Sequence, residues 1–138
     1  MILSRLEQVE YERYTKEFDF TSFIRNKTFL ITGSGGMTGR AIIKWILYEN
    51  MIHNTNAKIY ASTRNPEKLP SYVEKDDNVV MCQFGKEEDV IGKNDVDYVI
   101  HAASPTEREF FINYPAETFQ IIVEGTMKML EFSKKKDA

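Results

Sequence analysis

The chain has 138 residues, 42% hydrophobic and 28% charged, which is typical of a single globular domain, and its net charge of −3 argues against a nucleic-acid binder with a basic surface. A single cysteine excludes an internal disulfide framework and a cysteine-rich zinc site. Because the sequence has no apolar run of about 18 residues and no signal-peptide core after its first residues, we expect a cytoplasmic protein that does not span a membrane.

Residues 1–27 are predicted to form an N-terminal helical and aromatic extension. The charged stretch 2–17 carries a weak apolar stripe, which predicts a short surface helix, with a frayed leader as the alternative. The apolar residues that follow are expected to pack on the edge of the next unit rather than to bind a ligand: Phe18, Phe20, Phe23 and Ile24.

From residue 28 onward, short apolar runs alternate with helical patterns. The predicted strands are residues 28–32, 58–63, 79–84 and 96–103. Helices are predicted from the glycine-rich segment to about His53, briefly after Pro66, and from Pro115 to about Lys135, whereas 87–94 is predicted to be a polar connection. This alternation is typical of an α/β fold. Right-handed crossovers would give a Rossmann-like doubly wound parallel sheet, in its N-terminal half, with strand order 3-2-1-4 and flanking helices.

The last predicted helix has an apolar stripe at helical spacing. Its members recur at three- and four-residue intervals along one face: Phe119, Ile122, Val123, Thr126, Met127 and Leu130. This periodicity indicates an amphipathic helix.

Three glycines form the pattern G-x-x-G-x-x-G between the first predicted strand and the first long helix. Gly33 would permit the tight turn, Gly36 the approach of a pyrophosphate, and Gly39 the close packing of helix on strand. The amides near Met37 and Thr38 would then point at the phosphates, at the positive end of the helix. The pattern favours a dinucleotide site, and the alternative is a glycine-rich turn without a ligand.

The end of the second predicted strand bears on which dinucleotide binds. NAD sites usually carry an acidic residue there, whereas this chain has Thr63 followed by Arg64. An arginine can pair with the 2′-phosphate of NADP through charge-assisted hydrogen bonds. NADP is therefore favoured, and NAD stays open if Arg64 is only a solvated loop residue.

Several motifs resemble a known family. They are Thr32-Gly33-x-x-Gly36-x-x-Gly39, the segment 97–103 (DYVIHAA), Pro115-x-Glu117-Thr118, Glu124-Gly125-Thr126 and Leu130-Glu131. In this order they resemble the extended short-chain dehydrogenase/reductase family, in its nucleotide-sugar epimerase/dehydratase branch, over about residues 26–136. The resemblance implies a partial NAD(P)-binding Rossmann domain over residues 28–138, with a nucleotide-sugar substrate in the full-length protein.

The resemblance also implies positions for the cofactor. In the family the glycine loop holds the pyrophosphate, the segment after strand four lines the ribose, and the turn after strand three flanks the adenine. With the residues identified above, the predicted cofactor site comprises Gly33, Ser34, Gly36, Met37, Thr38, Gly39, Thr63, Arg64, Gln83, Phe84, Ala102, Ala103 and Ser104. Two positions depart from the family pattern, because Gln83 stands where an Asp is common and Ile122 where an Asn is common.

The catalytic pair of the family is missing from this sequence. Family catalysis uses a Tyr with a Lys four residues later, but none of the seven tyrosines here has a Lys at that spacing. We therefore predict no catalytic residue, and no metal site, in this chain, which ends before the segment that would supply the pair. It is expected to be the N-terminal, dinucleotide-binding fragment of a longer epimerase/dehydratase-like oxidoreductase, or else a truncated gene product. The alternatives are a non-enzymatic NAD(P)-sensing or interaction module and a folding remnant without a ligand.

Three further expectations concern the predicted sheet. His101 is expected to be a hydrogen-bonded structural residue rather than a general base, and Cys82 a small buried apolar residue. The last strand would be an apolar edge, and exposed edges of this kind pair with other chains. We therefore predict self-association through that strand.

Overall fold

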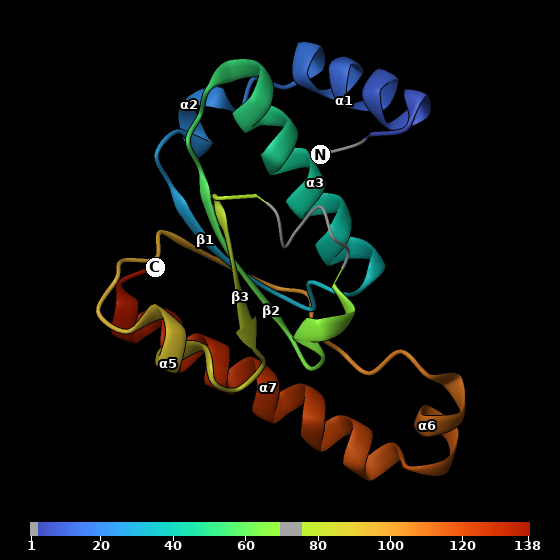
Figure 1. Ribbon diagram of the computed structural model, residues 1–138. Helices are drawn as coiled ribbons and strands as arrows, with labels where there is room; N and C mark the ends of the chain where they lie inside the picture. Colours follow the sequence, from blue (N-terminus) through green and yellow to red (C-terminus); the bar gives the residue numbers. More distant parts are fainter. Residues whose placement is uncertain (1–2, 70–75) are drawn as a thin grey trace.

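A computed structural model describes residues 3–69 and 76–138 and shows an α/β fold (Figure 1). The strands are β1 (Thr28–Thr32), β2 (Lys58–Thr63), β3 (Val79–Gln83) and β4 (Tyr98–His101). The helices are α1 (Arg5–Glu17), α2 (Thr21–Ile24), α3 (Met37–His53), η1 (Pro66–Lys68), α5 (Glu87–Ile91), α6 (Arg108–Asn113) and α7 (Pro115–Lys136). The strands form one parallel sheet of order β3-β2-β1-β4, which confirms the predicted Rossmann-like topology.

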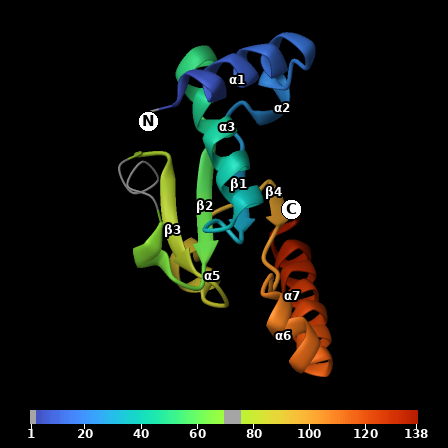
Figure 2. The ribbon, with the colours of Figure 1, turned by 90° about the vertical axis from the view of Figure 1, so that its right-hand side faces the viewer.

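Helices pack on both faces of the sheet (Figure 2). Because side chains alternate along a strand, Phe29 and Ile31 of β1 pack with α3, whereas Leu30 faces the opposite side. On that side the core includes Met129 and Phe132 of α7. The apolar run of β1 is thus buried on both faces, as its composition predicts.

The N-terminal helix α1 lies against α3. It begins with a capping box in which the Ser4 hydroxyl accepts from the Glu7 amide and the Glu7 carboxylate accepts from the Ser4 amide. The Lys44 ammonium of α3 donates to Glu7, and the Thr15 hydroxyl donates to the buried Glu49 carboxylate at 2.5 Å. The predicted N-terminal helix is therefore confirmed from Arg5 onward.

The aromatic residues after α1 pack on the edge of the α/β unit, as predicted. The ring of Phe23 stacks on Tyr98 of β4, with centroids 4.6 Å apart. Phe20 contacts the Trp45 ring edge-on at 5.7 Å, and Phe18 stacks on Phe20 at 6.1 Å. These contacts join α2 to both α3 and the sheet.

The structure corrects the predicted elements after β3. The stretch 87–94, predicted to be a polar connection, contains helix α5, whose first turn is acidic and whose Ile91 side chain is fully buried. Strands β3 and β4 are shorter than predicted and end at Gln83 and His101, whereas β1 and β2 have the predicted bounds. Helix α6 was not predicted, because its six residues are too few to show a clear period.

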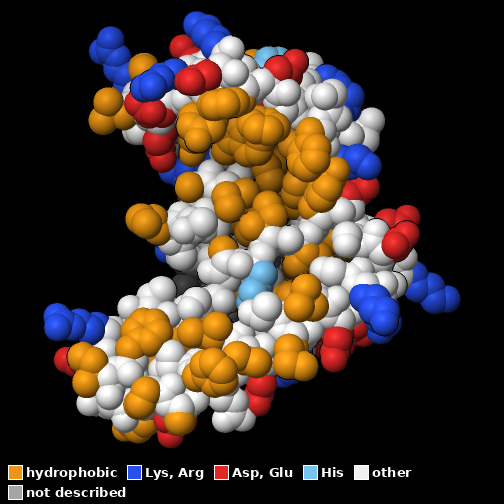
Figure 3. All heavy atoms as spheres, turned by 180° about the vertical axis from the view of Figure 1, so that it is seen from behind, with side chains coloured by type: hydrophobic (Ala, Val, Ile, Leu, Met, Phe, Trp, Pro, Cys, Tyr) orange, Lys and Arg blue, Asp and Glu red, His pale blue; other side chains and the backbone are white. Residues whose placement is uncertain are grey.

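Helix α7 is confirmed, but most of its apolar stripe is exposed. Phe119 and Leu130 are 70% and 64% exposed, whereas Met129 and Phe132 near the C-terminal end are buried. Leu130 is exposed in the C-terminal half of the helix, although its neighbours Met129 and Phe132 are buried. Figure 1 shows that the N-terminal half of α7, which carries Phe119, extends past the sheet together with α6. Seen from the opposite side, hydrophobic side chains accordingly lie on the surface of this part (Figure 3).

Candidate functional site

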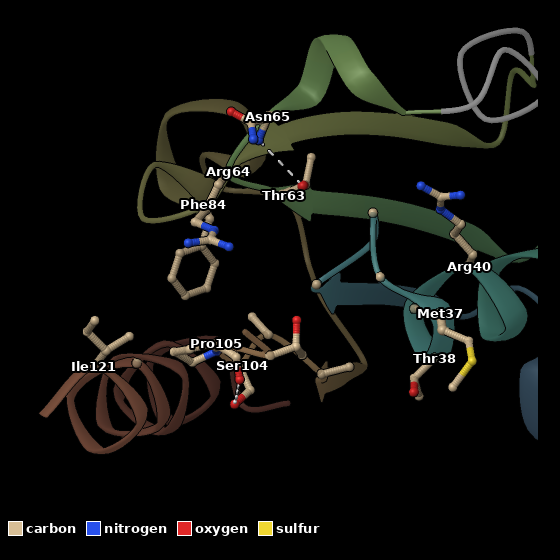
Figure 4. A pocket seen from close by; sticks show the side chains of 18 residues that line it. Met37, Thr38, Arg40, Thr63, Arg64, Asn65, Phe84, Ser104, Pro105 and Ile121 are labelled. Carbon is tan, nitrogen blue, oxygen red and sulfur yellow. Dashed lines mark hydrogen bonds between the residues drawn. The ribbon is translucent and has the colours of Figure 1, made fainter. Parts of the chain in front are cut away.

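A cavity of about 490 Å³ lies beyond the carboxyl ends of the parallel strands, between the start of α3 and the middle of α7 (Figure 4). Strands β2 and β3 lie on one side of β1, and β4 lies on its other side. The cavity is therefore at the point where the strand order reverses. Its volume is in the range of small-molecule sites. The predicted site residues that line it are Gly33, Gly36, Met37, Thr38, Gly39, Thr63, Arg64, Phe84, Ala102, Ala103 and Ser104.

Two glycines, Gly33 in the turn after β1 and Gly39 in the first turn of α3, are required by close backbone contacts. Gly33 has φ +69°, and a Cβ there would lie 2.5 Å from the Ala102 carbonyl oxygen. A Cβ on Gly39 would lie 2.9 Å from both the Gly33 carbonyl carbon and Ser34 Cα. Because these neighbours are backbone atoms, neither position accepts a side chain without moving the loop.

The start of α3 offers free amide groups to the cavity. Its N-cap is Gly36, which has no side chain to cap the helix, so no intrahelical or side-chain acceptor serves Met37 and Thr38. The first turn also contains no acidic residue. This end of the helix therefore presents a positive potential to the cavity, which suits a phosphate group.

The charged side chains that line the cavity are both cationic. Arg40 and Arg64 are exposed guanidinium groups, and the described residues that line the cavity include no carboxylate. Figure 4 shows Arg40 beside the start of α3 and Arg64 near Phe84, at the other end of the cavity. Bare glycine backbone, free amides and two guanidinium groups form a donor set that fits a diphosphate with a further anionic group.

Phe84 supplies a flat apolar wall at the Arg64 end of the cavity. Its amide donates to the Thr63 carbonyl at 2.9 Å, which ties the turn after β3 to the end of β2. Its ring stacks on His101 with centroids 6.4 Å apart, and Ile121 and Gly125 of α7 line the same region. Such a wall suits a planar ring system.

His101 is held at the end of β4 by a hydrogen bond. Its Nδ1 lies 2.7 Å from the Thr32 hydroxyl, which also accepts from the Ala103 amide at 3.2 Å. Burial lowers the pKa of the imidazole below its ordinary value, while the Glu87 charge opposes this shift. The expected hydrogen bond of His101 is confirmed.

Two predicted site residues do not line the cavity. Ser34 is fully buried, and its hydroxyl donates to the Ile31 carbonyl at 2.6 Å. Gln83 is exposed at the end of β3. Residues that the sequence analysis missed also contribute to the lining: Gly35, Arg40, Asn65, Pro105, Thr106, Ile121 and Gly125. Of these, Gly125 carried a recognisable signal, because glycine is unfavourable inside a helix.

In residues 3–69 and 76–138, no group of three or more His, Cys, Asp or Glu side chains could hold a metal ion. Within the same ranges, no helix combines the length and apolar character needed to cross a bilayer.

Cys82 is buried, as predicted, and burial together with the Glu87 charge raises the pKa of its thiol to about 12. The thiol is therefore not a nucleophile at neutral pH.

The sequence is similar to that of known proteins. A family model described as the NAD dependent epimerase/dehydratase family matches residues 29–138. The chain is also similar to a dTDP-glucose 4,6-dehydratase of Haemophilus influenzae, with 30% identity over 111 residues. That alignment covers 76% of this chain and 32% of the relative, so the chain spans about a third of the relative's length.

Proposed function

The chain belongs to the NAD dependent epimerase/dehydratase family, and we propose that residues 28–138 bind a nicotinamide dinucleotide in the cavity beyond the sheet. The observation that carries this proposal is the convergence on one cavity of bare glycine backbone, free helix amides and two arginines, without a carboxylate. Residues 1–27 are proposed to be an extension that buttresses α3 through α1.

Each part of the cofactor has a proposed place in the cavity. The diphosphate lies against the Met37 and Thr38 amides, as the positive end of α3 favours. The segment Ala102–Ser104 lines the ribose, and Phe84 flanks the adenine. Ser34 is proposed to support cofactor binding indirectly, because its buried hydroxyl fixes the backbone of the glycine loop. The exposed side-chain amide of Gln83 is proposed to bond to the edge of the adenine.

NADP is proposed as the preferred cofactor. Arg64 follows the last residue of β2, the position from which NAD-binding proteins usually present an acidic side chain to the ribose. A carboxylate would repel a 2′-phosphate, whereas the exposed guanidinium can bind it with two hydrogen bonds. Arg40 adds a second positive charge to the same cavity.

For the whole protein we propose hydride transfer between the nicotinamide and a carbon of a nucleotide-sugar. The proposal is supported by the family and by the dehydratase relative, whose name specifies a dTDP-glucose substrate. When bound, the nicotinamide would supply the hydride chemistry. Because none of the tyrosines has a Lys four residues later, this chain is proposed to bind the cofactor without catalysis. A non-enzymatic NAD(P)-sensing module would share these binding residues.

Calorimetric titration of the chain with NADP and with NAD tests the proposal. We expect heat from a single site, with the tighter dissociation constant for NADP. Absence of binding by both dinucleotides at concentrations of about 1 mM, where even weak sites of about 4 kcal/mol are half filled, would refute it.

We also propose self-association through β4, which is an edge strand of the sheet. Sedimentation over a range of protein concentrations should show growth in mass. Amide exchange should then slow in β4 but not in β3, the opposite edge strand, as concentration rises. A monomer at every concentration would rule out this interface.

A further inference from the structure

Glu87 is a buried carboxylate just outside the proposed cofactor cavity. Only 4% of its surface is exposed, although it is the first residue of the short helix α5. None of the ion pairs among the described residues involves it. Burying an unpaired carboxylate is costly, so its hydrogen bonds must hold it in place.

The hydrogen bonds of Glu87 connect strand β2 to the turn that follows β3. Its carboxylate accepts from the Ser62 hydroxyl of β2 at 2.6 Å and from the Gly85 amide, at 3.0 Å and 2.9 Å to its two oxygens. Gly85 directly follows Phe84, whose amide bonds to Thr63 at the end of β2. Glu87 therefore fixes the turn from which the Phe84 ring reaches the cavity wall.

The electrostatics of the helix do not explain this burial. The first turn of α5 also contains Glu88 and Asp89, which are exposed and complement the positive helix end without losing their hydration. Glu88 in addition pairs with Lys135 at the surface, at 2.8 Å. The third acidic residue, Glu87, points inward to Ser62 of β2, so its burial stabilises the turn after β3 rather than the end of α5.

We propose that Glu87 is a positioning residue that holds Phe84 in the orientation needed to stack on the adenine ring of the bound nucleotide. This inference rests on the proposed function, because it assigns the adenine end of the same cavity. Its action passes through the Gly85 amide, since Glu87 itself does not line the cavity.

The test compares a ligand that carries adenine with one that does not. ADP and inorganic pyrophosphate are titrated calorimetrically into the wild-type chain, Glu87→Gln and the matched control Glu88→Gln. Urea unfolding of each variant gives its folded fraction. Glu87→Gln keeps the side-chain volume and one acceptor oxygen but loses the charge. Ser62→Ala, which leaves the carboxylate in place, provides a milder second variant.

We expect Glu87→Gln to weaken ADP binding about tenfold, the effect of one hydrogen bond to a charged group, and to leave pyrophosphate binding unchanged. Ser62→Ala should weaken ADP in the same direction by a smaller factor, and Glu88→Gln should match the wild type. A purely structural role would lower the folded fraction and reduce the binding of both ligands together, which would overturn the inference. Unchanged ADP binding in both Glu87→Gln and Ser62→Ala would also overturn it. Failure of the wild-type chain to bind ADP, NADP and NAD would instead remove the proposed function and this inference with it.

Discussion

The Thr32 hydroxyl at the end of β1 lies 2.7 Å from Nδ1 of His101 at the end of β4. The same oxygen accepts from the Ala103 amide at 3.2 Å, so its own proton is free to be donated to Nδ1. One hydroxyl thus joins two neighbouring strands and fixes the start of the segment that lines the proposed ribose site.

Thr32→Val tests this junction. The substitution keeps the shape of the side chain but leaves Nδ1 of His101 and the Ala103 amide without this partner, at a cost of about 1–3 kcal/mol in the free energy of unfolding. Thr126→Val is the control, because that hydroxyl is exposed and bonds only within its own helix. Urea unfolding should separate the two variants, and equal stabilities would contradict the role given to Thr32.

The pKa of His101 predicts a pH dependence of stability. The ordinary pKa of histidine is 6.5, and burial lowers it in the folded chain. Between these two pKa values the unfolded state therefore binds a proton that the folded state does not. The contribution of His101 to the free energy of unfolding should therefore be complete above about pH 6.5 and decrease as the pH falls. It should be fully lost below the pKa of His101 in the folded state. Carboxylates such as Glu7, whose pKa Lys44 lowers to about 2, add their loss only in more acidic solution.

His101→Gln should flatten this part of the profile, because the amide replaces the imidazole and does not titrate. The measurement is the unfolding midpoint in urea from about pH 8 to about pH 5, where unperturbed carboxylates are still ionised. If His101→Gln shows the same pH profile as the wild type, the neutral imidazole does not contribute to the pH dependence of stability.

The sequence predicted the elements whose signals are local. Buried parallel strands such as Thr28–Thr32 read as continuous apolar runs, and the glycine spacing marked the loop that follows. The burial of α7 could not be predicted, because the period of its stripe does not tell which part of the helix overlies the sheet. Arg40 was missed as a cavity residue, since its place depends on how the first turn of α3 faces the cavity rather than on the glycine spacing alone.

Arg64→Gln tests the preference for NADP. The variant loses a charge-assisted contact with the 2′-phosphate, worth about 1.5–3 kcal/mol, so NADP affinity should fall at least tenfold while NAD affinity is unchanged. Arg40→Gln is the matched comparison, because Arg40 lies at the start of α3, near the diphosphate that both cofactors share. It should weaken both dinucleotides equally. A loss confined to NADP in Arg40→Gln would instead assign the 2′-phosphate to Arg40.

Gly39 and Gly125 both line the cavity, but the space beside them differs. A Cβ on Gly39 would overlap backbone atoms of Gly33 and Ser34, so Gly39→Ala should cost about 1–3 kcal/mol or more and displace the loop that is proposed to hold the diphosphate. A Cβ on Gly125 would lie 3.8 Å from Nε2 of His101 and 3.9 Å from the Phe84 ring, which are ordinary contacts.

Gly125→Ala should therefore raise stability by about 0.5–1 kcal/mol, because alanine is the better helix former, yet weaken dinucleotide binding. The added methyl group would enter the region between Phe84 and α7 where the adenine is proposed to lie. Urea unfolding measures the change in stability, and calorimetry on the same preparations measures the change in dinucleotide affinity. Gly39→Ala, in contrast, should lose both stability and binding. If Gly125→Ala gains stability and binds NADP as tightly as the wild type, the adenine does not lie against α7, because only an occupied cavity makes that methyl group unfavourable.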